Sequence, residues 1–80
     1  MDRQRIFEKV VFIVKDVFDA DGEKITERTG SDDIEAWDSL THLELIGEIE
    51  RAFQIKFSMQ EIMKIENVGQ ILNIVEGKMK

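Results

Sequence analysis

The chain has 80 residues, of which 42% are hydrophobic and 35% charged, and its formal net charge is -6. A chain this short buries about 60% of its unfolded surface, which leaves no room for a deep catalytic cleft, and the absence of cysteine excludes disulfides, thiolate zinc sites and a thiol nucleophile. No apolar run approaches the roughly 18 residues of a membrane span, and acidic proteins bind nucleic-acid phosphates poorly. We therefore expect a monomeric, cytoplasmic single domain over residues 1–80 that is not an enzyme and binds neither nucleic acid nor membrane.

The first predicted helix covers residues 3–18, where apolar residues recur at spacings of three and four: Ile6, Val10, Ile13, Val14 and Val17. Residues 19–36 show no sustained periodicity and contain two glycines, so they predict a long surface loop, with Ile25 and Ile34 as its apolar anchors. Long loops in small domains are more often functional than idle. We therefore expect functional residues at the C-terminal end of this loop.

A second helix is predicted to begin at Asp38 or Ser39, because either side chain can accept hydrogen bonds from the free N–H groups of a first helical turn. The apolar pattern continues this helix to about Phe53. Its predicted buried face is Leu40, Leu43, Ile46, Ile49 and Phe53, flanked by Leu45 and Ala52.

Two further helices follow. Ser58 with Glu61 three residues later matches a capping box, which predicts a third helix of less than two turns. Asn67 can cap a fourth helix, with Gly77 near its C-terminal end and a buried edge made of Val68, Ile71, Leu72 and Val75. The predicted fold class is all-α: a small four-helix bundle of three long helices and one short helix, with a long loop between the first and second helices.

The acidic surplus lies around the second predicted helix, since residues 31–57 contain seven acidic and two basic residues. Such a concentration of negative charge would steer a basic partner toward this helix. The alternative is a solvated helix face without a partner.

The segment EAWDSLTHLELIGEIERAF, residues 35–53, resembles the acyl carrier proteins, and the match centres on the tripeptide Asp38-Ser39-Leu40. The order of the predicted helices extends this resemblance over nearly the whole chain. It implies that Ser39 carries covalent 4′-phosphopantetheine, attached from coenzyme A by a pantetheinyl transferase, and that Asp38 helps to engage that enzyme and its magnesium. The alternative is that both residues only cap the helix.

The amino-acid composition agrees with this resemblance. A chain without cysteine can hold a thioester only if an attached cofactor supplies the thiol. A helix N-terminus also favours the phosphodiester anion that the attachment creates. The implied function is an acyl carrier that delivers acyl intermediates to fatty-acid, lipid or polyketide-type enzymes. Alternatives are a stand-alone aminoacyl or peptidyl carrier, or an acidic interaction module without a prosthetic group.

The resemblance further implies that basic surfaces of acyl-loading and acyl-transferring enzymes dock on the second helix, through Leu40, Glu44, Ile46, Glu48 and Glu50. Leu40 and Ile46 are alternatively core residues. Thr41 and Arg51 depart from the more acidic pattern of fatty-acid carriers, and Trp37 stands where many relatives have a small residue. These departures suggest a specialised carrier, although Trp37 alternatively anchors the loop.

A cavity for the acyl chain is expected from the resemblance, lined by Leu43, Ile49, Met63, Ile65 and Ile71, which are otherwise ordinary core residues. Two other motifs are set aside. Residues 19–22 resemble part of a calcium loop, but the flanking positions lack the required ligands. Asp38, Ser39 and His42 have the residue types of a catalytic triad, but nothing builds an oxyanion hole, so His42 is expected at the surface.

Overall fold

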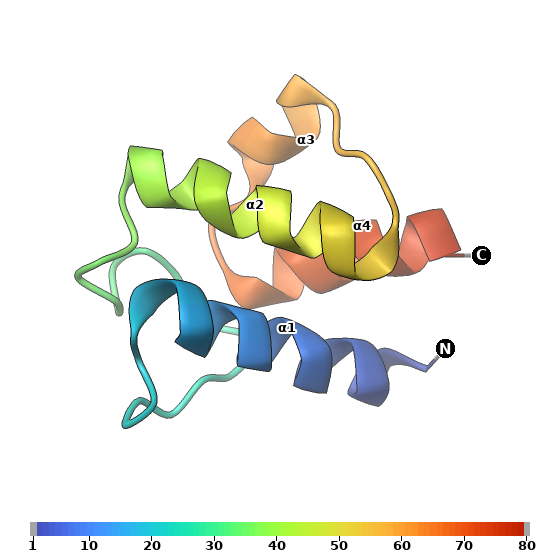
Figure 1. The fold of residues 1–80 in the computed structure, drawn as a ribbon. Helices are drawn as coiled ribbons and strands as arrows, with labels where there is room; N and C mark the ends of the chain where they lie inside the picture. Colours follow the sequence, from blue (N-terminus) through green and yellow to red (C-terminus); the bar gives the residue numbers. More distant parts are fainter. Residues whose placement is uncertain (1, 80) are drawn as a thin grey trace.

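The computed structural model describes residues 2–79, which form four helices and no strand (Figure 1). The helices are α1 (Arg3–Phe18), α2 (Ser39–Phe53), α3 (Met59–Lys64) and α4 (Val68–Met79). Helix α1 packs against both α2 and α4 and runs in the opposite direction to α2. The predicted four-helix bundle, with one short helix and a long first loop, is confirmed.

The helix termini follow from side chains that pair with free backbone groups. Asp2 caps α1 by accepting from the Arg5 N–H, at 2.9 Å. The predicted capping box opens α3: the Ser58 hydroxyl accepts from the Glu61 N–H at 3.1 Å, and the Glu61 carboxylate accepts from the Ser58 N–H at 2.8 Å. Asn67 accepts from the Gln70 N–H at 2.9 Å and so caps α4, as predicted.

The buried face of α2 is rotated relative to the predicted face. Leu45 is fully buried, whereas Leu40 and Leu43 are 70% and 52% exposed. The actual buried set, Leu45, Ile46, Ile49 and Phe53, still follows helical spacing. Helical periodicity alone placed Leu40 and Leu43 on the buried face. The exposure of Leu40 agrees instead with the exposed position that the resemblance implied for it.

The loop between α1 and α2 is fixed against the start of α4 rather than loose. Thr29 and Glu27 accept backbone hydrogen bonds from Val68 and Gly69, at 2.9 and 2.8 Å. Ile25 and Ile34 are buried, as predicted. Gly30 lies so close to the segment that precedes α4 that an added Cβ would be 2.3 Å from the Glu66 carbonyl oxygen. The far end of the loop is therefore held in a defined position.

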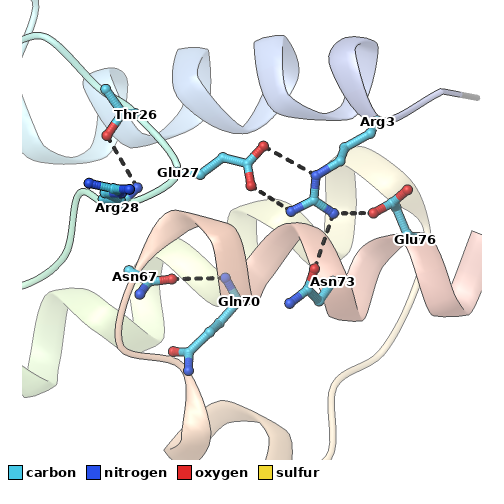
Figure 2. A network of polar contacts seen from close by, with 8 residues as sticks. All are labelled: Arg3, Thr26, Glu27, Arg28, Asn67, Gln70, Asn73 and Glu76. Carbon is cyan, nitrogen blue, oxygen red and sulfur yellow. Dashed lines mark hydrogen bonds and ion pairs between the residues drawn. The ribbon is translucent and has the colours of Figure 1, made fainter.

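An ionic network strengthens the same contact (Figure 2). The Arg3 guanidinium donates to both carboxylate oxygens of Glu27, at 2.6 and 3.2 Å, and to Asn73 at 3.1 Å. It also pairs with Glu76. The hydrogen bonds from Arg3 hold the pKa of Glu27 below its usual value. One side chain thus joins α1, the loop and α4.

None of the helices within residues 2–79 has the length and apolar character needed to cross a membrane.

Candidate functional site

The site is the junction where the long loop meets α2. Asp38 is the N-cap of α2, and its carboxylate accepts from the N–H groups of Leu40 and Thr41, both at 3.0 Å. Ser39 is the first helical residue and is exposed. Of the two predicted caps, Asp38 therefore does the capping, and the Ser39 hydroxyl is left free of that role.

Thr41 completes a capping box that the sequence analysis missed. Its hydroxyl accepts from the Asp38 N–H at 2.8 Å and donates to the Ala36 carbonyl at 2.6 Å. The local signal was the spacing Asp-x-x-Thr, in which threonine takes the place that Glu or Gln usually has in this motif. The departure of Thr41 from an acidic residue thus has a structural explanation.

The Asp38 carboxylate stays ionised because backbone donors stabilise its charge. The backbone N–H of Thr41 makes the largest contribution, and the Leu40 N–H adds to it, so that the pKa of Asp38 lies below its usual value. A fixed negative charge therefore lies next to Ser39.

An open groove of about 370 Å³ begins beside Ser39 and runs between α2 and α3. Its apolar lining is Trp37, Leu43, Met59, Ile62, Met63 and Ile65, and its polar lining is Ser31, Asp38, Ser39, His42 and Glu66. Of the predicted cavity residues, Leu43, Met63 and Ile65 line this groove. Ile49 and Ile71 do not, because both are fully buried in the core.

His42, which was expected at the surface, is half-buried in the wall of the open groove. Its Nδ1 lies 2.9 Å from Trp37 Nε1, and its Nε2 lies 2.9 Å from the Ile62 carbonyl oxygen. Trp37 is buried and stacks on Phe18, with ring centroids 5.3 Å apart, so it anchors the end of the loop. Both ring nitrogens of His42 are thus engaged away from Ser39, which agrees with setting the catalytic triad aside.

The predicted docking residues have different surroundings. Leu40 and Glu44 are exposed. Glu48 is half-buried and pairs with Arg51. Glu50 is half-buried and accepts from the Phe57 N–H at 2.8 Å, which fixes the turn after α2. Ile46 is 1% exposed, so it belongs to the core, and the predicted contact between Ile46 and partners is wrong.

Residues 2–79 contain no group of three or more His, Cys, Asp or Glu side chains that could hold a metal ion.

Comparison with known proteins gives consistent matches. The family model described as "Phosphopantetheine attachment site" matches residues 8–75. An acyl carrier protein of Thermosynechococcus vestitus is 34% identical over 79 residues, which cover 98% of this chain and 96% of that protein. An acyl carrier protein of Streptococcus pyogenes serotype M3 is 37% identical over 75 residues, covering 94% of this chain and 97% of that protein.

Solved structures agree. The solution structure of holo acyl carrier protein from Geobacter metallireducens matches with a TM-score of 0.84 and 38% identity, over 91% of this chain and 84% of that chain. The helical fold of residues 2–79 agrees with this match. The chain therefore belongs to the acyl carrier protein family, whose members bear 4′-phosphopantetheine and are carriers rather than enzymes.

Proposed function

We propose that Ser39 bears the 4′-phosphopantetheine, and that the chain presents acyl groups to the enzymes that load and use them. The observation that carries this proposal is the division of roles at the start of α2. Asp38 caps the helix, so the exposed hydroxyl of Ser39 is available for modification. A cytoplasmic location is part of the proposal, since a chain without cysteine shows no adaptation to an oxidising compartment.

The residues around Ser39 fit the group. The hydroxyl can form a phosphoester as the pyrophosphate bond of coenzyme A breaks, releasing the nucleotide half of the coenzyme and the hydroxyl proton. The mainly apolar groove that begins at Ser39 suits an extended, weakly polar arm. Once attached, the group supplies a thiol, which this chain lacks, and acyl groups are carried on it as thioesters.

Asp38 and the exposed residues of α2 serve recognition in this proposal. The ionised Asp38 carboxylate repels the phosphate of the attached group to some extent, so its favourable use is to engage the transferase and its magnesium. Leu40 offers an apolar contact, and Glu44 offers a charge that basic partners can approach. Glu48 and Glu50 contribute less to docking, because each already has a partner within the chain.

The proposal is tested by mass. Incubation with coenzyme A, magnesium and a broad-specificity pantetheinyl transferase should raise the mass of the chain by roughly 340 Da, the mass of the transferred group. Ser39→Ala should abolish this increase.

The matched control is Ser31→Ala, because Ser31 is also exposed and lines the same groove. This variant should gain the full mass. A folded wild-type chain that gains no mass, or a Ser39→Ala variant that does, would refute the assignment of Ser39.

A further inference from the structure

Helix α3 is the least secured element of the fold. It has six residues, and none of them is buried. Within residues 2–79, two polar contacts join its residues to other helices. Lys78 of α4 pairs with Glu61 at 3.1 Å, and His42 of α2 contacts the Ile62 carbonyl at 2.9 Å. Ile62 is also partly buried against the core, and His42 supplies a polar contact between α2 and α3.

The hydrogen bonds of His42 fix which ring nitrogen carries the proton. The indole N–H of Trp37 can only donate, so Nδ1 of His42 must accept. The proton is therefore on Nε2, which donates to the Ile62 carbonyl. This carbonyl is near the C-terminal end of α3 and also accepts the N–H of the C-cap residue Ile65, at 3.4 Å. His42 thus links the buried Trp37 to the end of α3.

The hydrogen bond between His42 and Ile62 lies where the groove meets the core. His42 and Ile62 both line the groove that begins at Ser39. Behind the groove, the core is filled by fully buried residues such as Ile49 and Ile71. An acyl chain that passes from the groove into the interior must move α3 away from α2. That movement would break the bond between His42 and Ile62.

We propose that His42 is a positioning residue that limits how deeply an acyl group can enter between α2 and α3. With the bond to Ile62 intact, the cargo stays in the outer groove, so the chain shelters short acyl groups and leaves the distal part of long ones exposed. The acyl part of this inference depends on the proposed function, whereas the restraint on α3 does not.

Two substitutions separate the two bonds of His42. In His42→Asn the amide oxygen can replace Nδ1 and accept from Trp37, but the shorter side chain cannot reach Ile62. In His42→Gln the amide nitrogen can replace Nε2 and donate to Ile62, while the bond to Trp37 is weakened. Each variant loses or weakens one neutral hydrogen bond. The two variants should therefore lose a similar amount of overall stability.

The first measurement is amide hydrogen exchange of residues 62–64 in the unmodified protein. Loss of one hydrogen bond that restrains α3 should speed this exchange about fivefold to tenfold in His42→Asn, and His42→Gln should stay close to wild type. Amides of the buried residues Val10 and Val14 in α1 report on global unfolding. Faster exchange of α3 in both variants, or in neither, would overturn the proposed restraint.

The second measurement uses chains loaded with butanoyl, octanoyl or dodecanoyl groups and follows cleavage of the thioester by hydroxylamine. In the wild type, protection should be the same for octanoyl and dodecanoyl. In His42→Asn the dodecanoyl thioester should be cleaved at least about fivefold more slowly than the octanoyl thioester, because additional methylene groups become buried. Equal length dependence in wild type and His42→Asn would overturn the limit on acyl length.

The two measurements distinguish failure of this inference from failure of the proposed function. If Ser39 cannot be modified, the proposed function fails and the limit on acyl length fails with it. The exchange measurement still decides whether His42 restrains α3.

Discussion

Thr41 shows how one small side chain sets the local geometry of the proposed modification site. Its hydroxyl accepts from the Asp38 backbone and donates to the Ala36 carbonyl, so it holds both the last residues of the loop and the first residue of the cap. The Asp38 carboxylate in turn accepts from the Thr41 N–H. These reciprocal bonds fix the backbone on both sides of Ser39.

We predict that Thr41→Val lowers the free energy of unfolding by about 1–2 kcal/mol, because the replacement has a similar shape but leaves the Ala36 carbonyl and the Asp38 N–H without this partner. Urea denaturation monitored by circular dichroism measures the change. Thr41→Ser retains the hydroxyl and should lose less stability. A loss in Thr41→Ser as large as the loss in Thr41→Val would show that the methyl group contributes as much to stability as the hydroxyl, which would contradict the prediction.

Individual residues were predictable where the chemistry is local. Asp38 was identifiable as a helix cap from its position before a predicted helix, whereas the role of Ser39 stays a prediction. The bonds of His42 were not identifiable, because one of its partners is a backbone carbonyl 20 residues away whose position depends on the packing of α3. No local pattern reports such a contact.

At the scale of an element, α2 has one face that packs in the core and another face that is exposed. Leu45 is fully buried against the core, and Leu40, five residues earlier on the same helix, is largely exposed. Leucine therefore occupies two different environments within α2, one buried and one exposed.

We predict that Leu45→Ala lowers the free energy of unfolding by about 2–5 kcal/mol, because it removes buried methyl groups and leaves a cavity. Leu40→Ala should change it by no more than about 0.5 kcal/mol, as is usual for exposed positions. Thermal or urea denaturation of both variants gives the comparison. A similar cost at the two positions would mean that Leu40 is covered in solution and cannot serve as a free docking residue.

The helices themselves were largely predictable, since their ends are determined by short-range capping signals. Asp38, Ser58 and Asn67 each precede a helix at the expected position. The rotation of the buried face of α2 was not predictable, because it depends on how little of α2 the short α3 covers. Periodicity identifies a helix, but its neighbours decide which apolar residues are buried.

For the molecule as a whole, carboxylates with lowered pKa values couple folding to pH. Hydrogen bonds lower the pKa of Glu27, Asp38 and Glu61. The strongest contributors are, in turn, the Arg3 guanidinium, the Thr41 N–H and the Ser58 N–H. In each case the ionised form is favoured by the folded state, so unfolding is accompanied by proton uptake at low pH.

We predict that stability is maintained above the ordinary values of these groups, 4.5 for Glu and 3.8 for Asp, and is lost as the pH falls through their lower values in the folded state. The urea midpoint measured from neutral to acid pH tests this. Glu27→Gln removes one of the two carboxylate partners of Arg3, so it should lower the urea midpoint at neutral pH and reduce the decrease in that midpoint on acidification.

The control for this prediction is Glu23→Gln, which removes the same charge from the same loop without removing a partner of Arg3. The urea midpoint of Glu23→Gln should still decrease more on acidification than the urea midpoint of Glu27→Gln. Identical pH profiles for the two variants would mean that the contact between Arg3 and Glu27 does not contribute to the pH dependence.

Trp37 is the single tryptophan of the chain, and it lies on the wall of the groove beside Ser39. Its indole stacks near the imidazole of His42, at a centroid distance of 6.1 Å, and its surroundings depend on how α2, α3 and the loop meet. The protein thus contains an intrinsic fluorophore at the place where a carried group would rest. Its emission can report cargo loading in real time, without a label and without background from other indoles.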